Sequence, residues 1–96
     1  MRVEYHPSTA SDLNDAISHY NDLRVGLGDA FRDEIYAVID RILENPEIYA
    51  EVKGVRRALV KRFPYSVIYT ATRIDCVRVL VIRHHRRHPE HGATRR

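Results

Sequence analysis

The sequence is poor in cysteine, glycine and proline and has no tryptophan, which limits the classes of protein to which it can belong. Its 96 residues include one cysteine, no tryptophan, four glycines and four prolines. The lone Cys76 excludes an internal disulfide and is typical of a protein in the reducing cytoplasm. No segment approaches the roughly 18 consecutive apolar residues of a membrane-spanning helix, and the charged start MRVEYH is unlike a signal peptide. We therefore expect a small cytoplasmic domain with no membrane partner.

Acidic residues are scarce in the second half of the chain. Residues 1–50 carry ten acidic and four basic side chains, whereas residues 51–96 carry three acidic and twelve basic ones. Such a basic half favours a polyanionic partner, either nucleic acid or an acidic protein. The alternative is that the two halves neutralise each other within one fold.

Apolar residues recur with helical spacing through most of the first half. Residues 2–6 alternate between polar and apolar and predict a short strand that ends at Pro7. From Ser8 to Leu23 apolar residues follow at steps of three and four, which predicts a helix that Ser8, Thr9 or Ser11 can cap. After a glycine-containing break, the same spacing predicts a second helix over 28–44 and hence an antiparallel helical hairpin.

The second half is rich in β-branched and aromatic residues. Residues 56–62, 66–71 and 76–82 predict three strands, and their short connections can join only antiparallel neighbours. The fold class is therefore α+β, with the order β-α-α-β-β-β and the helical hairpin packed on an antiparallel sheet. We expect one domain over residues 1–92 and a flexible C-terminal tail over 93–96.

The last predicted strand is apolar on both faces. Simple alternation places Val77, Val79 and Val81 on one face, and Leu80 and Ile82 on the other. The helices can cover one face only. We therefore expect a partner protein or a second copy of the chain to cover the other.

Four histidines and three arginines follow this strand in the stretch RHHRRHPEHG, residues 83–92. Zinc ligation is disfavoured because the nearby carboxylates are limited to Glu90 and the arginines repel a cation. Cys76 sits in a predicted strand, where a thiol is usually a small buried apolar group. We expect no metal site, no cofactor and no cysteine nucleophile.

Arginine and lysine side chains suit a surface that binds a target, since guanidinium groups match phosphate oxygens. An alternative is that charges on edge strands only prevent aggregation. Tyr65 and Tyr69 can stack on a base or belong to the core. The predicted target-binding basic surface consists of Arg56, Arg57, Lys61, Arg62, Arg83, Arg86, Arg87 and His88.

The stretch VRRALVKRFPYSVIYTATRIDCVRVLVIRHHRRHP resembles the RelE/ParE superfamily of bacterial toxins. The similarity covers nearly the whole chain and includes the helices and the ENPEIY-to-KGVRR connection. It implies the fold above, a cognate antitoxin that wraps the toxin, and a toxin–antitoxin hetero-oligomer. It also implies one of two targets. RelE-like members cleave mRNA on the ribosome without a metal, whereas ParE-like members poison DNA gyrase.

The residues that match the RelE cleavage set favour the ParE-like alternative. Arg57 and Arg86 keep the basic character of their positions. Leu59 and Ser66 replace basic residues, and the usual C-terminal tyrosine falls near 91–92, where there is none. The resemblance therefore implies a toxin that poisons gyrase rather than an enzyme.

Two alternatives stay open. In the first, the chain is a ribosome-dependent mRNA endoribonuclease in which Arg57 and Arg86 hold phosphate, while His84 or His85 serves as acid and base. In the second, the chain is a degenerate member that still binds an antitoxin but is no longer toxic.

Overall fold

The computed structural model of the protein describes residues 1–87 and 90–96, and all of their side chains except those of residues 72–73. Among the described residues, no helix is long and apolar enough to cross a membrane. The elements in chain order are β1 (Arg2–Tyr5), α1 (Thr9–Leu23), α2 (Leu27–Glu44), β2 (Glu51–Val52), β3 (Val55–Leu59), β4 (Tyr65–Arg73) and β5 (Cys76–His84).

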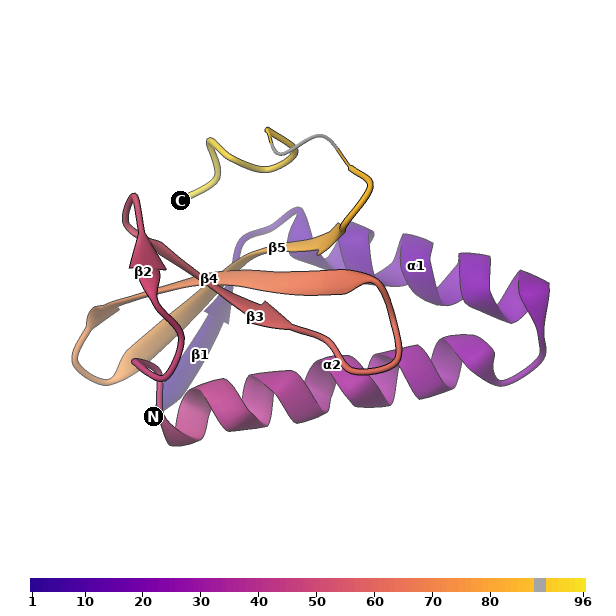
Figure 1. Ribbon diagram of the computed structural model, residues 1–96, viewed down its shortest axis with the longest axis horizontal. Coiled ribbons are helices and arrows are strands. Elements are labelled where there is room, and N and C mark those ends of the chain that lie inside the picture. The colour runs from indigo at the N-terminus through magenta and orange to yellow at the C-terminus, as the bar shows by residue number, and fades with distance from the viewer. Residues whose placement is uncertain (88–89) are drawn as a thin grey trace.

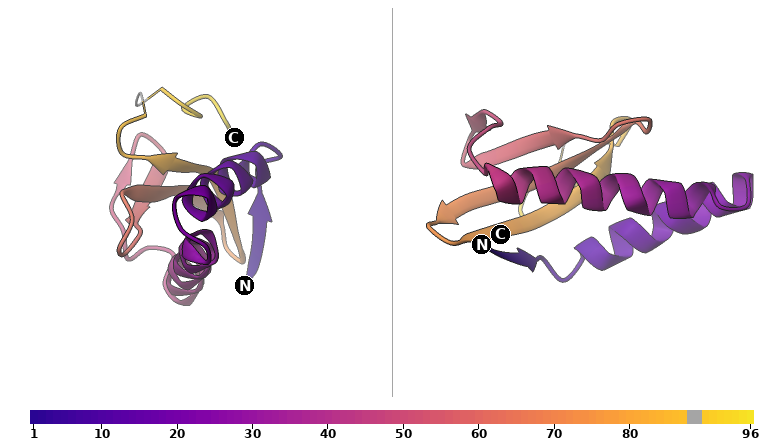
Figure 2. Two further views of the ribbon diagram at one scale, coloured as in Figure 1. Left: turned by 90° about the vertical axis from the view of Figure 1, so that its right-hand side faces the viewer. Right: turned by 90° about the horizontal axis from the view of Figure 1, so that it is seen from below.

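The α+β class and the predicted order of elements are confirmed. The five strands form one sheet in the order β1-β5-β4-β3-β2, with the two helices side by side on one face (Figures 1 and 2). Two details differ from the expectation. The short strand β2 is additional, and the sheet is mixed because β1 pairs parallel with β5. All the other pairs are antiparallel, as short connections require.

The turn between β3 and β4 begins earlier than expected. β3 ends at Leu59, not at residue 62, and Arg62 adopts a left-handed backbone conformation with φ of 70°. The backbone N–H of Val60 still donates to the carbonyl of Tyr65 at 3.0 Å, which closes the turn. Residues 61–64 therefore form a turn instead of extending the strand, with Lys61, Arg62 and Pro64 exposed and Phe63 buried.

The first turn of α1 supplies hydrogen bonds to β5 beyond the point where β1 ends. β1 stops at Tyr5, so the outer edge of β5 has no strand neighbour from Leu80 onward. The Thr9 hydroxyl donates to the carbonyl of Leu80 at 3.1 Å, and the Ile82 N–H donates to the Asp12 carboxylate at 3.2 Å. The helix thereby replaces the missing strand, as buried backbone polar groups require.

The prediction that Ser8, Thr9 or Ser11 caps α1 with its side chain is not met by Ser8 or Thr9. Ser8 is the N-cap residue but makes no side-chain cap hydrogen bond. Thr9 is buried, with 3% of its surface exposed, and its hydroxyl bonds to β5 and not to the helix. Packing against the sheet has therefore overridden the local capping preference.

A β-bulge in β5 corrects the expected alternation of side chains. Ile68 of β4 pairs with Val81 and the next residue, Tyr69, pairs with Val79, so Leu80 is the extra residue. Val77, Val79 and Ile82 consequently face the helices. Leu80 and Val81 lie together on the opposite, open face with Ile68 of β4 and Val55 of β3.

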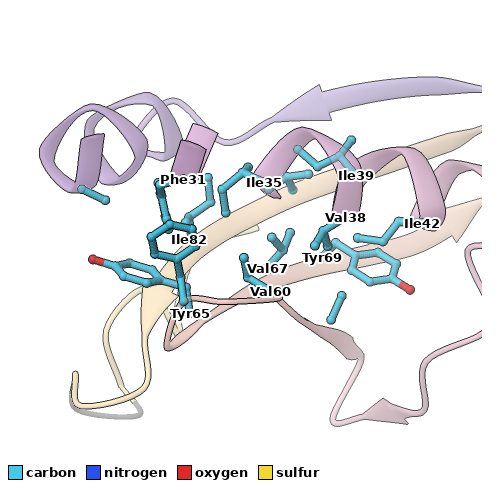
Figure 3. Close-up of a cluster of buried hydrophobic side chains, with 14 of the residues drawn as sticks. Phe31, Ile35, Val38, Ile39, Ile42, Val60, Tyr65, Val67, Tyr69 and Ile82 are labelled. Atoms are coloured by element: carbon cyan, nitrogen blue, oxygen red, sulfur yellow. The ribbon is translucent and has the colours of Figure 1, made fainter. Parts of the chain in front are cut away.

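The main core lies between α2 and the helix-facing side of the sheet (Figure 3). Its largest fully buried side chains include Tyr69, Phe31, Ile35 and Ile42. An aromatic group formed by Tyr20, Phe31, Phe63 and Tyr65 lies where the β3–β4 turn meets the helices. The core residues from α2 are Phe31, Ile35, Val38, Ile39 and Ile42, and those from β4 and β5 are Tyr65, Val67, Tyr69, Val77, Val79 and Ile82.

The two helices pack closely together at Gly28. A Cβ atom on Gly28 would overlap the carbonyl oxygen of Ile17 and press on the side chain of Asn21. The backbone N–H of Gly28 donates to the Asn21 side-chain oxygen at 2.8 Å. The glycine is thus required by close packing within the hairpin.

Gly28→Ala is expected to lower the free energy of unfolding by about 1–3 kcal/mol, because the helices must separate to admit the methyl group. Helix propensity alone predicts the opposite sign, a gain of about 1 kcal/mol. Urea unfolding followed by circular dichroism decides between the two. A variant more stable than the parent would contradict the close approach of the helices.

Candidate functional site at the basic end of the sheet

Two basic turns meet where β4 begins and β5 ends. The β3–β4 turn carries Lys61–Arg62, and Arg86–Arg87 follow β5. The backbone N–H of His85 donates to the carbonyl of Pro64 at 2.8 Å, which holds the two turns side by side. All four basic side chains are exposed. We call these four residues the basic turns.

A polar cluster lies next to the basic turns, on the open face of the sheet. The Arg57 Nε–H donates to the Ser66 hydroxyl oxygen at 2.9 Å, and Ser66 Oγ lies 3.0 Å from His85 Nε2. Only 2% of Ser66 is exposed, whereas Arg57 and His85 are both exposed. A buried hydroxyl therefore fixes the positions of two solvent-facing basic groups.

Arg83 belongs to the same face. It pairs with Ser66 in the register of β4 and β5. Its pKa is lowered, first because the guanidinium is partly buried and second because the positive charge of Arg57 is close by. Its Nη1 also donates to the carbonyl of His91 at 3.2 Å. Arg57 and His85 thus contact Ser66, and Arg83 lies opposite it on the neighbouring strand.

His84 points to the other side of the sheet. Its ring contacts Tyr65 edge-to-face with centroids 5.0 Å apart, and it lines a polar cavity with Asp12 and His19 of α1. Burial is the largest cause that lowers the pKa of His84, followed by the charge of Arg86 and further basic neighbours. Its Nδ1 accepts a hydrogen bond from the Arg86 backbone N–H at 2.9 Å. These effects favour the neutral form of His84.

The residues expected for a nuclease are consequently divided. The structure brings Arg57 and His85 together through Ser66. It places His84 on the helix-facing side and Arg86 in an exposed turn. From the sequence alone, Ser66 is only a residue that replaces a basic side chain of the RelE-like set. Its new role depends on the register of three strands, which no local pattern in the sequence reports.

Arg56 lies on the opposite face of β3 from Arg57. Its Nη1 donates to the carbonyl of Tyr49 at 2.5 Å, and its Nη2 lies 3.4 Å from the carboxylate of Glu51. With 17% of its side chain exposed, it fastens the loop after α2 to β3. His88, the remaining member of the expected surface, lies outside the described residues.

The C-terminal residues contact the open face and α1. Residues 93–96, the expected tail, include Arg95, whose Nη1 donates to the Asp12 carboxylate at 2.6 Å and to the Leu80 carbonyl at 3.1 Å. Gly92 packs so closely on Val81 that a Cβ atom there would overlap the valine side chain. The segment thus covers part of the apolar surface at the bulge. Figure 1 shows this end of the chain passing above the strands.

Both tyrosines considered for base stacking are core residues. Tyr65 is 9% exposed and Tyr69 is fully buried. The Tyr69 hydroxyl donates to the Pro46 carbonyl at 2.7 Å, and burial raises its pKa to about 12. Neither ring is therefore presented to a target.

Among the residues that the structure describes, no three His, Cys, Asp or Glu side chains lie close enough together to hold a metal ion. Cys76 is buried, with 3% of its surface exposed, so the thiol is not presented to solvent.

Comparison with known families identifies the chain. The family model described as the ParE toxin of the type II toxin–antitoxin system parDE matches residues 3–89 of the sequence. The chain belongs to the ParE toxin family. The match includes all helices and strands except Arg2, the first residue of β1, together with the basic turns.

A solved structure supports the ParE fold. The structure described as the chromosomal ParDE TA system from P. aeruginosa has a chain that superposes with a TM-score of 0.74 at 21% sequence identity. The alignment covers 88% of this chain and 95% of that one. A comparison with curated protein sequences finds no significant match.

In this ParE family member, the lowered pKa of His84 predicts a pH-dependent stability. As the pH falls below about 6.5, unfolded chains bind a proton at this histidine that the folded protein does not, so folding weakens. His84→Gln is expected to lose less stability than the parent between about pH 7 and pH 5.5. Urea unfolding at both pH values measures the difference. An equal or larger loss in the variant would show that His84 titrates normally in the folded state.

Proposed function

We propose that this chain is a toxin that arrests growth by poisoning DNA gyrase and that a cognate antitoxin neutralises it in the cytoplasm. The observation that carries the proposal is the ParE family match over residues 3–89. The ParE-like fold over most of the chain supports it.

The geometry of the basic residues also supports a toxin that binds rather than cleaves. A nuclease with paired histidines needs an acid and a base on either side of one phosphate. His84 and His85 are on opposite faces of the sheet, so at most one of them can face a given phosphate. Leu59, at a position where the RelE-like set has a basic residue, is 57% exposed and carries no charge.

The basic turns are the surface that we assign to gyrase. They are exposed and adjacent, and each is held by the backbone contact between His85 and Pro64. Rim charges of this kind accelerate association and orient the partner.

The antitoxin is the partner that we assign to the remaining apolar surface. Tyr5 and Tyr36 are 44% and 47% exposed and line an apolar cavity with Leu13 and Ile39. An antitoxin bound here in a toxin–antitoxin hetero-oligomer would bury apolar side chains that are exposed in the single chain.

Purified protein is expected to inhibit supercoiling of relaxed plasmid by gyrase and to accumulate linear DNA. Pre-mixing with the cognate antitoxin should restore supercoiling. No inhibition at a large excess of folded protein would contradict gyrase poisoning. Cleaved mRNA codons during growth arrest, without DNA damage, would instead favour the nuclease. Harmless overexpression of folded protein would favour the non-toxic alternative.

The double variant Arg86→Gln/Arg87→Gln is expected to weaken gyrase inhibition by about tenfold or more, because two exposed charges leave the assigned surface. Arg32→Gln/Arg41→Gln, on α2, removes the same charge elsewhere and serves as the matched control. The inhibitory concentrations are compared after thermal unfolding has shown that both variants are as stable as the parent. Equal inhibition by both double variants would exclude the basic turns as the contact surface.

A further inference from the structure

The outer edge of β1 presents backbone hydrogen-bonding groups to solvent. β1 is an edge strand, and no strand of the described part of the chain lies beyond it (Figure 2). The backbone N–H groups of Arg2 and His6 donate to carbonyl groups of Asp75 and Val79 at 2.8 Å. Because successive residues of a strand turn their backbone groups to opposite sides, those of Val3 point away from β5. An edge of this kind is a template for a further strand.

We propose that the strand that pairs with this edge is β1 of a second copy of the chain, antiparallel and centred on Val3. Val3 of each copy then exchanges both backbone hydrogen bonds with Val3 of the other. The result is a two-fold symmetric dimer in which the two sheets join into one. The inference goes beyond the proposed action on gyrase and does not depend on it.

The charges of β1 complement themselves in this register. With Val3 opposite Val3, Arg2 of each copy lies opposite Glu4 of the other copy. These two positions are the pairs without mutual backbone hydrogen bonds, in which opposing side chains approach most closely. The side chains of Arg2 and Glu4 are 61% and 36% exposed. Opposite charges at such positions stabilise a strand pair.

Other registers are disfavoured by the same charges. Moving the two-fold axis by one residue places Arg2 opposite Arg2 of the other copy, or Glu4 opposite Glu4. Like charges directly opposite each other destabilise a strand pair. Charges of one sign along an edge would block self-pairing in every register, which is how many edge strands avoid aggregation. β1 alternates the two signs instead, and this pattern permits pairing about Val3.

The open face continues this pattern of charge across the edge. Glu4 lies 4.0 Å from Arg78 of β5, its neighbour in the register of the two strands. Arg2 of the second copy lies on the other side of Glu4 in the proposed dimer. Positive, negative and positive groups therefore alternate across three strands, and such a network contributes more than an isolated surface pair.

The helix-facing side of β1 supplies apolar contacts in the same register. Val3 packs on the main core, and alternation places Met1 and Tyr5 on the same side. Tyr5 of each copy lies opposite Met1 of the other, and these side chains are 44% and 59% exposed. Tyr36 of α2, 47% exposed, lines the same cavity as Tyr5. Since both tyrosines border the surface that we assign to the antitoxin, the dimer is inferred for the chain without antitoxin.

Sedimentation velocity of the free chain between about 10 µM and about 1 mM tests the proposal, because an interface of a few residues per copy is small and weak. The parent chain is expected to shift from monomer to dimer across this range. Glu4→Arg places arginine opposite arginine at both charge pairs and is expected to raise the dissociation constant by about tenfold or more. Arg2→Glu is expected to have the same effect, because carboxylates then oppose each other.

A mixture of the two single variants is the decisive measurement. Each variant repels its own copies, but every charge pair between an Arg2→Glu chain and a Glu4→Arg chain is again of opposite sign. The mixture is expected to dimerise about tenfold more tightly than either variant alone. Asp22→Arg, exposed near the end of α1, changes the net charge as Glu4→Arg does and serves as the matched control. Thermal unfolding shows beforehand that each variant is folded.

A parent chain that stays monomeric up to about 1 mM would overturn the proposal and leave the edge to a strand of another protein. A dimer that Glu4→Arg leaves unchanged, or that Asp22→Arg weakens equally, would place self-association on another surface. A mixture that associates no more tightly than its components would show that the register about Val3 is wrong. None of these results bears on inhibition of gyrase.

Discussion

The structure depends on hydrogen bonds to the backbone groups of β5 that lie beyond the end of β1 and so have no strand partner on that edge. The first turn of α1 meets this need, since Thr9 donates to the Leu80 carbonyl and Asp12 accepts from the Ile82 N–H. Arg95 donates to both Asp12 and the Leu80 carbonyl, so the C-terminal residues join the same network. Buried backbone groups in this small domain therefore tie a helix, a strand and a terminus together. The hydrogen bonds form where the bulge interrupts the ladder.

The bulge at Leu80 also determines which histidine meets which arginine. After one extra residue, every later side chain of β5 lies on the face opposite to the one that simple alternation assigns. Arg83 and His85 consequently lie on the open face with Arg57, and His84 turns toward Tyr65 and α1. A regular strand would have exchanged the two histidines. The chemistry of the basic end is thus fixed by a backbone irregularity several residues away.

Two basic surfaces with different physical character lie at one end of this ParE family member. The side chains of the basic turns are exposed to solvent, as is common for charges at the rim of a protein–protein contact. The cluster around Ser66 is ordered by a buried hydroxyl that contacts both Arg57 and His85. Their adjacency follows from the contact of His85 with Pro64.

The sequence by itself determined the α+β class, the helical hairpin, the strand order along the chain and the concentration of charge in the second half, because periodicity and turn residues are local signals. It also carried the resemblance to the toxin superfamily. The tertiary structure alone decided the parallel pairing of β1, the bulge at Leu80 and the structural use of Thr9 and Arg56. It alone brought Ser66 between Arg57 and His85, because such contacts depend on the register of strands distant in sequence, and one inserted residue reverses every assignment that follows.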